Sequence, residues 1–162
     1  MAQCHQASIT HLKTFLAGIP SLNMNRALEV AAGDGQLTAD LLGGLYKDVD
    51  CFDQCGVAVA KLEELRQRVA AVDLVDQASM QSYEWQRVYT SVYLRWCVGY
   101  LEDQELVDFL RKAKSFLSSP TKLGLRSKVP SAFIFVLDNV LEEDEESYVS
   151  KGQRLRKVTD LE

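Results

Sequence analysis

The chain has 162 residues, enough for one domain with a substantial core and too few for two full domains. Apolar residues make up 47% and charged residues 25%, which excludes a disordered chain, and no apolar run approaches the roughly 18 residues of a membrane span. The net charge of −5, from 18 basic and 23 acidic side chains, argues against a nucleic-acid ligand and favours a basic partner.

The cysteines, the histidines and the first residues of the chain indicate in which cellular compartment we expect the protein. The four cysteines form no C-x-x-C pairs and both histidines lie at or before His11, so we predict no metal site. No basic-then-apolar secretory signal opens the chain. We therefore predict reduced thiols, no membrane association and a cytoplasmic or nuclear localisation.

The first half of the chain alternates predicted helices and strands. Apolar residues at helical spacing predict a helix over residues 8–19. A short buried strand is expected over 27–31, followed by a glycine-containing turn and an amphipathic helix that carries four leucines. A second strand over 49–53 and a second helix over 57–69 repeat the pattern.

The second half continues this alternation. Residues 72–75 and 88–94 are predicted strands, the latter rich in valine and tyrosine. A strongly amphipathic helix is expected over 103–117, and a surface loop with two of the three prolines over 118–131. The uninterrupted apolar run within 132–137 predicts a strand buried on both faces of a parallel sheet.

Strands that alternate with helices imply right-handed βαβ units. The predicted fold class is therefore α/β, with a doubly wound, mostly parallel sheet covered by helices on both faces. Ligands of such sheets bind beyond the carboxyl ends of the strands, where helix N-termini and free backbone N–H groups point. We therefore looked for functional residues at those ends.

Two glycines follow the first predicted strand, and a carboxylate ends the second. Gly33 and Gly35 let the backbone turn sharply and approach a ligand. Asp53 lies 20 residues after Gly33, the offset expected of a carboxylate that accepts ribose hydroxyls. The combination favours an adenosine site over a plain βα turn with a helix-capping aspartate. A third glycine for close helix packing is missing, which disfavours NAD.

Four segments resemble the class I S-adenosylmethionine-dependent methyltransferases, and among them most closely the protein α-N-terminal methyltransferases. Residues 27–38, ALEVAAGDGQLT, resemble the glycine-rich first motif, which many methyltransferases share. Residues 49–53, VDCFD, support it. The strings WCVGYLEDQ at 96–104 and FVLDN at 135–139 are the more specific matches. The resemblance covers about residues 8–139 and implies the Rossmann-like fold of class I methyltransferases.

The resemblance implies S-adenosylmethionine as the cofactor. Its methionine part would lie against the turn from Ala31 to Gly35, its ribose on Asp53, and its adenine between Met80 and Gln81. The implied cofactor-binding residues are Ala31, Gly33, Gly35, Gln36, Asp53, Met80, Gln81 and Arg95.

The resemblance also implies an acceptor site. Asp138 and Asn139 match an Asp-Asn pair that helps to hold the N-terminal residues of the peptide substrate, and Trp96 would line the same cleft. Methyl transfer to an amine requires alignment and desolvation of an unprotonated nitrogen, and a carboxylate within reach can take the amine proton. The implied catalytic residues are Asp138, Asn139 and Tyr100, with Asp138 as the proton acceptor.

Four positions depart from the family pattern, and each touches the implied site. A neutral amide at Gln36 replaces an arginine that pairs with the cofactor's carboxylate. Arg95 replaces a glutamine, and it repels the sulfonium unless its side chain turns toward that carboxylate. Ala31 replaces a glycine, and Tyr100 replaces a histidine, which is the better base at neutral pH.

We expect one domain over residues 1–162, with a helical region at 8–25, a cofactor-binding core at 26–139, and an acidic loop and terminal helix at 140–162. The C-terminal hairpin of class I methyltransferases is expected to be missing. Its loss would leave strand 132–137 at the sheet edge, so we predict a shortened chain, a dimer or a partner on that edge. The carboxylate run at 142–146 reads as a solvated loop or an attractor of a basic peptide.

Two functions from different classes remain open. The first is an enzyme that transfers a methyl group from S-adenosylmethionine to the α-amine of a protein or peptide. The alternative is a catalytically degenerate methyltransferase-like module that binds and regulates a partner protein, and the four departures favour it. Binding of S-adenosylmethionine would discriminate between them, whereas a nucleotide-dependent oxidoreductase would instead require NAD.

Overall fold

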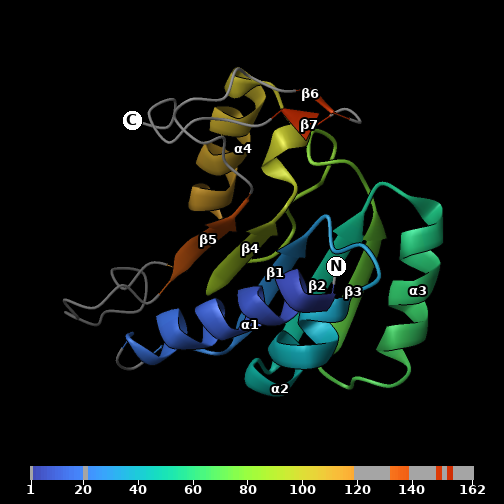
Figure 1. Cartoon of the computed structure of the whole chain (residues 1–162), viewed down its shortest axis with the longest axis vertical. Helices are drawn as coiled ribbons and strands as arrows, with labels where there is room; N and C mark the ends of the chain where they lie inside the picture. Colours follow the sequence, from blue (N-terminus) through green and yellow to red (C-terminus); the bar gives the residue numbers. More distant parts are fainter. Residues whose placement is uncertain (1, 20–21, 119–131, 139–148, 151–152, 155–162) are drawn as a thin grey trace.

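A five-stranded parallel sheet forms the centre of the computed structural model, which describes residues 2–19, 22–118, 132–138, 149–150 and 153–154. The strand order is β3-β2-β1-β4-β5 and every neighbouring pair is parallel, so the predicted doubly wound α/β fold is confirmed (Figure 1). The strands are β1 (Arg26–Val30), β2 (Asp48–Asp53), β3 (Val72–Gln77), β4 (Ser91–Arg95) and β5 (Phe133–Leu137).

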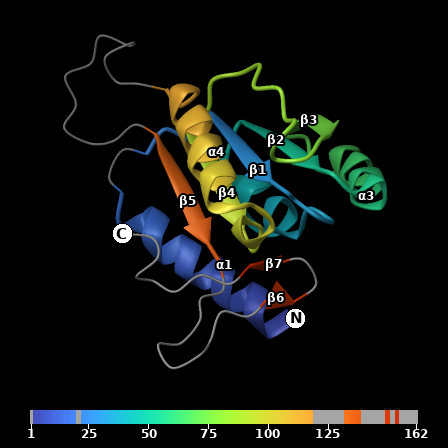
Figure 2. The same ribbon diagram turned by 90° about the horizontal axis from the view of Figure 1, so that it is seen from above.

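Helices cover both faces of this sheet (Figure 2). One face carries α1 (Ala2–Ala17), the π-helical turn η1 (Thr38–Leu42) with α2 (Gly43–Leu45), and α3 (Gly56–Arg66). The other face carries α4 (Asp103–Ser115), which starts with a capping box between Glu102 and Glu105. The short helix η2 (Val98–Tyr100) connects β4 to α4.

Each face has its own hydrophobic core, because alternate residues of a strand point to opposite sides. Leu28 and Val92 face α4 and pack with the aromatic rings of Tyr89 and Phe109. Ala27 and Val49 face the other way and pack with residues of α1 and η1, such as Leu12. These buried faces fix the strand register and therefore fix which residues reach the carboxyl ends of the sheet.

The sheet has its topological switch point between β1 and β4. Strand β1 pairs with β2 on one side and with β4 on the other, so the chain reverses its direction of winding there. A crevice opens above the carboxyl ends of strands at such a point, and ligands of doubly wound sheets bind in it. The functional site is built on this crevice.

At the opposite, amino-terminal edge of the sheet, charged side chains pair with one another. The Arg26 guanidinium donates to carboxylate oxygens of Asp48 at 3.0 Å, Asp50 at 2.8 Å and Asp73 at 2.8 Å. Arg87 also donates to Asp50, at 3.1 Å, and to Asp73. Asp50 has no exposed side-chain surface and also accepts a hydrogen bond from the hydroxyl of Tyr89, at 3.0 Å.

Several element boundaries differ from the sequence prediction, including the end of α3 at Arg66 and the end of β3 at Gln77. Helix α1 begins at Ala2 rather than near residue 8. Strand β4 begins at Ser91 rather than at residue 88, because Tyr89 forms a bridge with Leu117 instead of joining the sheet. The predicted helix after the glycine turn contains the π-helical turn η1, and Leu45 at its end is exposed rather than buried.

Strand β5 is an edge strand of the described sheet, in which β4 is its neighbour. Residues Val149–Ser150 (β6) and Gln153–Arg154 (β7) form a separate antiparallel pair, so the expected terminal helix is wrong for these four residues. The predicted surface loop over 119–131 and the acidic run at 142–146 lie outside the described residues.

Candidate functional site

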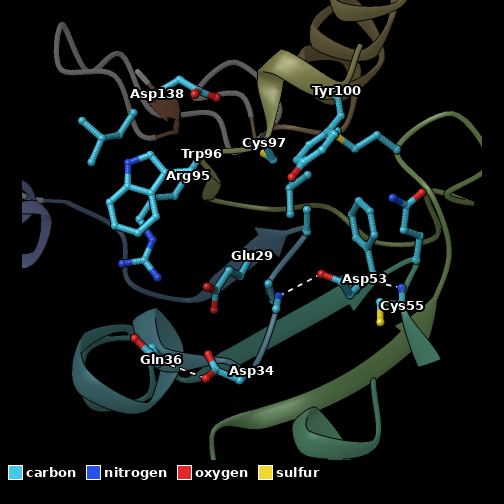
Figure 3. Close-up of a pocket in the computed structure, with 18 of the residues that line it drawn as sticks. Glu29, Asp34, Gln36, Asp53, Cys55, Arg95, Trp96, Cys97, Tyr100 and Asp138 are labelled. Atoms are coloured by element: carbon cyan, nitrogen blue, oxygen red, sulfur yellow. Dashed lines mark hydrogen bonds between the residues drawn. The ribbon is translucent and has the colours of Figure 1, made fainter. Parts of the chain in front are cut away.

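A cavity of about 1110 Å³ lies above the carboxyl ends of β1, β2, β4 and β5. Residues that follow β1, β2 and β3 form its floor and one wall, and the segment after β4 forms another. Residues from the N-terminal half of α1 line it as well, so α1 borders the cavity in addition to packing on the sheet. Figure 3 shows the side chains that converge on this space.

The turn after β1 has the backbone conformation that the glycines suggested. Gly33 has φ +60°, and a Cβ at this position would meet no atom within 4 Å, so the backbone faces open space. Ala31 has φ +49°, a left-handed conformation that glycine adopts without strain and alanine does not. The alanine that departs from the family pattern therefore stands at a strained position that lines the cavity.

Gly35 has a different role from the predicted one. It does not line the cavity. A Cβ at Gly35 would lie 2.6 Å from Cδ2 of Leu65 and 2.8 Å from Cδ2 of Leu62, both on α3. Gly35 therefore permits close packing of the turn against α3, the role of the third glycine that the sequence pattern lacks. This geometry does not support the prediction of Gly35 as a cofactor contact.

Asp53 braces the turn from the end of β2. Its Oδ2 accepts a hydrogen bond from the backbone N–H of Gly33 at 2.9 Å, and its Oδ1 accepts one from the N–H of Cys55 at 2.8 Å. The carboxylate is thus fixed between the glycine turn and the start of α3, facing the cavity (Figure 3). Cys55 lines the cavity and is exposed, whereas Cys51 is buried.

Glu29 is a buried carboxyl group beneath the cavity. Its Oε2 accepts hydrogen bonds from the backbone N–H of Thr38 at 3.1 Å and from the Thr38 hydroxyl. Burial raises the pKa of Glu29 from its ordinary value of 4.5 to about 7, although the Thr38 hydroxyl and the nearby Arg95 act in the opposite direction. The cavity floor therefore contains a carboxyl group whose ionised form is unfavourable.

Arg95 lies at the end of β4 and points toward α1 and the turn. Its Nη1 donates to Nδ1 of His5 at 2.7 Å and to Oγ of Ser8 at 3.2 Å. Its guanidinium carbon lies 4.7 Å from the centre of the Trp96 ring, within the range of a cation–π contact. Burial lowers the pKa of Arg95, while the charges of three carboxylates, Glu29 first, raise it.

Gln36 does not reach Arg95 or the backbone of the turn. Its Nε2 donates to Oδ2 of Asp34 at 2.9 Å. Both side chains line the cavity (Figure 3). The amide that stands in place of the family's arginine is therefore used to fix Asp34.

The other predicted residues lie around the mouth of the cavity. Met80 and Gln81 come from the loop after β3, and Nε2 of Gln81 lies 3.5 Å from Oε1 of Glu105 on α4. The hydroxyl of Tyr100 points into the cavity from η2 (Figure 3). Oδ2 of Asp138 accepts a hydrogen bond from the backbone N–H of Val98 at 2.8 Å.

Trp96 has φ +57°, so a second non-glycine residue with a left-handed backbone borders the same cavity. The backbone N–H of Trp96 donates to the carbonyl oxygen of Leu137 at 2.8 Å, which joins the ends of β4 and β5. Strained backbone positions concentrate at functional sites, where the surrounding structure holds them. Asn139, predicted beside Asp138, lies outside the described residues.

Most of the predicted site therefore converges on one cavity, and sequence reasoning missed two contributors. His5, Ser8 and His11 line the cavity from α1, and none of the three was predicted as a site residue. Their spacing of three residues, which places them along one side of a helix, was the available signal. Glu29 was missed because a carboxyl group inside an apolar strand gives no pattern of its own.

The described residues give no support for a metal centre or a membrane span. They contain no group of three or more histidine, cysteine, aspartate or glutamate side chains placed to hold a metal ion. Among the helices of the described part, none has the length and apolar character needed to cross a bilayer.

The parallel sheet, its switch point and the turn braced by Asp53 define a class I S-adenosylmethionine-dependent methyltransferase fold. Over residues 3–160 the chain matches the family described as AdoMet-dependent proline di-methyltransferases, AdoMet being S-adenosylmethionine. The chain belongs to this family.

Curated relatives of the chain are named as N-terminal methyltransferases. The N-terminal Xaa-Pro-Lys N-methyltransferase 1 of Danio rerio is 32% identical over 119 residues, which cover 72% of this chain and 48% of the relative. The alpha N-terminal protein methyltransferase 1 of Dictyostelium discoideum is 24% identical over 139 residues, which cover 82% of this chain and 47% of the relative. The chain therefore spans about half the length of the curated relatives it matches.

Solved structures agree with the fold. A SAM-dependent methyltransferase from Leishmania major superimposes with a TM-score of 0.80 at 25% identity, covering 99% of this chain and 61% of the other. The structure of DhpI with SAH superimposes with a TM-score of 0.69 at 18% identity, covering 99% and 73%, and supports the fold alone. The Rossmann-like methyltransferase architecture is thus confirmed.

The family uses S-adenosylmethionine, and the residues present fit it. The cavity offers a carboxylate, Asp53, of the kind that accepts ribose hydroxyls, a glycine backbone open to a ligand at Gly33, and a cation, Arg95, for a carboxylate.

Proposed function

We propose that this chain binds S-adenosylmethionine in the cavity and methylates the α-amine of a protein or peptide N-terminus. The observation that carries the proposal is the bond from the Gly33 N–H to Asp53, which fixes a ribose-accepting carboxylate beside a ligand-facing backbone at the switch point of the sheet. The family match and the similarity to named N-terminal methyltransferases support the reaction and the acceptor class.

The proposal assigns the two ends of the cofactor to opposite sides of the cavity. Asp53 would accept the ribose hydroxyls, and Met80 and Gln81 would frame the adenine. Ala31, Gly33 and Gln36 would border the methionine part, with Arg95 as the nearby cation. Gly35 would support the turn from behind rather than touch the ligand.

The acceptor would enter beside Trp96, at the side of the cavity where β4 and β5 end. S-adenosylmethionine supplies an activated methyl group, so the chain needs only to align and desolvate an unprotonated amine. Asp138, held by the Val98 N–H, is the proposed proton acceptor. Tyr100 would orient the amine through its hydroxyl, and Asn139 would hold the peptide together with Asp138.

Several finer expectations join this proposal. We propose a single domain over residues 1–162, a basic protein or peptide substrate, no nucleic-acid partner, and a cytoplasmic or nuclear location. Because β5 forms the edge of the described sheet, we also propose that a second copy or a partner pairs with it. Sedimentation of the purified chain as a monomer, with no slower or faster species across a concentration series, would contradict self-association.

The degenerate, partner-binding module is the competing function. The observation that favours it is Gln36, whose amide is bonded to Asp34 where the family has an arginine. This alternative predicts a folded protein that gives no methyl transfer with any N-terminal peptide.

Methyl transfer to short peptides tests the proposal. The purified chain is incubated with S-adenosylmethionine and a peptide that begins Xaa-Pro-Lys, and mass spectrometry follows the gain of methyl groups on the α-amine. Asp53→Asn should reduce the rate by at least about tenfold, since it removes a charged acceptor for the ribose. Asp76→Asn is the matched control, because Asp76 lies on β3 outside the cavity lining and should leave the rate unchanged.

Methylation of the α-amine that depends on Asp53 and not on Asp76 supports the proposal. A folded wild-type chain that binds S-adenosylmethionine but methylates no such peptide would overturn the proposed acceptor. A peptide whose α-amine is acetylated serves as the negative substrate, because it has no basic nitrogen at its N-terminus.

A further inference from the structure

Positive charge is scarce around the cavity. Among the described residues that line it, Arg95 is the only lysine or arginine, whereas the carboxyl groups of Glu29, Asp34, Asp53 and Asp138 all border it. A ligand that carries a carboxylate needs a counter-charge in such surroundings, and a guanidinium is the side chain best suited to supply it. Arg95 is therefore the group on which recognition of an anionic ligand depends.

Gln36 cannot easily share this task. Its Nε2 is bonded to Asp34 at 2.9 Å, so its amide donates to a residue of the chain itself. The second N–H of this amide is neutral, so it is a weaker donor to a ligand carboxylate than the N–H groups of a guanidinium. The geometry thus favours Arg95 over Gln36 as the partner of a carboxylate.

His5 sets the direction of the Arg95 side chain. Arginine can only donate hydrogen bonds, so Nδ1 of His5, at 2.7 Å from Nη1, must be the acceptor. The proton of neutral His5 then sits on Nε2, which donates to Oδ2 of Asp40 at 2.8 Å. The side chain of His5 is only 12% exposed. Asp40, His5 and Arg95 form a chain of hydrogen bonds from η1 through α1 to β4.

The bonds of Arg95 to other described side chains use Nη1, toward His5 and Ser8. The flat guanidinium also rests against the Trp96 ring, which restricts its rotation. Two such restraints leave the remaining N–H groups in a defined direction, on the side of the cavity where Glu29 and Gln36 lie (Figure 3). Long arginine side chains lose considerable rotamer freedom when they bind, and a pre-oriented one loses less.

We propose that His5 is a positioning residue that holds Arg95 for the carboxylate of the ligand's methionine part, so that α1 and the cofactor cavity are coupled through one hydrogen bond. The inference rests on the proposed function, because it takes the S-adenosyl cofactor as the ligand. It assigns a binding role to the N-terminal helix and to a residue that makes no contact with the reacting atoms.

Two related ligands separate this role from a general loss of structure. S-adenosylhomocysteine carries the amino-acid carboxylate, and 5′-methylthioadenosine has the same adenosine and thioether sulfur without it. Calorimetry measures the dissociation constants of both for each variant. His5→Ala should weaken binding of S-adenosylhomocysteine by about fivefold, the effect of losing one orienting hydrogen bond, and leave that of 5′-methylthioadenosine within about twofold.

Two amide variants identify which nitrogen matters. The side-chain oxygen of asparagine lies about where Nδ1 of histidine lies, so His5→Asn keeps an acceptor for Arg95 and should retain most of the affinity. The amide of glutamine reaches the place of Nε2, so His5→Gln keeps only the contact to Asp40 and should behave like His5→Ala. Gln6→Ala is the matched control, because Gln6 neighbours His5 on the same helix, is exposed and does not line the cavity.

The outcomes are distinct. A selective loss for S-adenosylhomocysteine in the alanine and glutamine variants of His5, with rescue by asparagine and no effect of Gln6→Ala, supports the inference. Equal losses for both ligands, or none, overturn it while leaving the proposed function intact. A wild-type chain that binds neither ligand overturns the proposed function and the inference with it. Urea unfolding of each variant confirms that all of them are folded at the temperature of the titration.

Discussion

The two ends of the parallel sheet both carry clusters of charge, but they use it differently. At the amino-terminal edge, Arg26 and Arg87 pair with three aspartates, and each carboxylate of the cluster has an arginine partner. At the carboxyl edge, one arginine faces four carboxyl groups across a cavity of about 1110 Å³. Every carboxylate of the first cluster is paired with an arginine of the chain, whereas the second cluster surrounds a cavity that a ligand could fill.

This difference separates stability from function. Paired charges at the amino-terminal edge hold three neighbouring strands and Arg87 together, so their removal should destabilise the fold without touching the cavity. The carboxyl edge contains strained backbone at Ala31 and Trp96 and, at Glu29, a carboxyl group whose ionised state is unfavourable. Substitutions that remove the strain or the charge should therefore raise the free energy of unfolding while they alter ligand binding. Substitutions at Asp50, Glu29 and Ala31 test this division.

The largest expected effect is at Asp50, whose side chain is fully buried. Asp50→Asn removes the charge that faces Arg26 and Arg87 and weakens the bond from Tyr89. We expect a loss of about 3 kcal/mol in the free energy of unfolding, since breaking a buried ion pair is strongly destabilising. Both arginines would then depend on Asp48 and Asp73, whose side chains are more exposed than that of Asp50. Urea unfolding measures it.

Asp48→Asn is the control for Asp50. Asp48 has one arginine contact and a partly exposed side chain, so its loss should be at most about 1 kcal/mol. Equal effects at both positions would show that burial does not set the strength of this cluster. Ligand affinity should stay unchanged in both variants.

Glu29 should make stability depend on pH. Because its pKa is raised from 4.5 to about 7 in the folded chain, the folded state binds a proton that the unfolded state releases at lower pH. Its contribution is therefore fully present below about pH 4.5 and is lost as pH rises through about 7. Glu29→Gln should flatten this fall, worth about 2 kcal/mol between roughly pH 5 and pH 8, because glutamine stays neutral and still accepts from Thr38.

Urea unfolding at a series of pH values measures the dependence for the wild type and for Glu29→Gln. Parallel curves for the two proteins would contradict the raised pKa of Glu29. If the difference in pH dependence between the wild type and Glu29→Gln is smaller with S-adenosylhomocysteine than without it, ligand binding and the ionisation of Glu29 are linked.

A smaller effect is expected at Ala31. With φ at +49°, alanine is strained, and Ala31→Gly should stabilise the fold by about 0.5–1 kcal/mol after the greater chain entropy of glycine is subtracted. The neighbouring Ala32→Gly, where φ is not positive, should destabilise by a similar amount. Thermal unfolding distinguishes the signs, and a loss of stability at both positions would show that Ala31 carries no strain.

Much of this account could be predicted from the sequence because it depends on local patterns. The apolar run over 132–137 predicts β5, but the predicted burial of this strand on both faces is wrong, because β5 is an edge strand of the described sheet and Val136 is exposed. The glycines before η1 predict the turn, and Asp53 follows from its offset to Gly33. The role of Gly35 could not be predicted, because it depends on how closely α3 packs behind the turn.

The contributions of α1 were also out of reach of pattern reasoning. His5 acts through Arg95, a residue 90 positions away in the sequence, so only the folded chain shows the contact. The later start of β4 has a similar cause, since the backbone of Tyr89 forms hydrogen bonds with Phe116 and Ser118 rather than with a strand of the sheet. Long-range polar contacts are the common reason for these misses.

Calorimetric titration with S-adenosylhomocysteine tests the central claim most directly. We expect one-site binding for the wild type and for Asp48→Asn at the amino-terminal edge, and an affinity at least about tenfold weaker for Asp53→Asn at the carboxyl edge. No heat of binding and no thermal shift with either S-adenosylmethionine or S-adenosylhomocysteine, in a protein that is folded, would contradict the claim that the carboxyl edge is a working cofactor site.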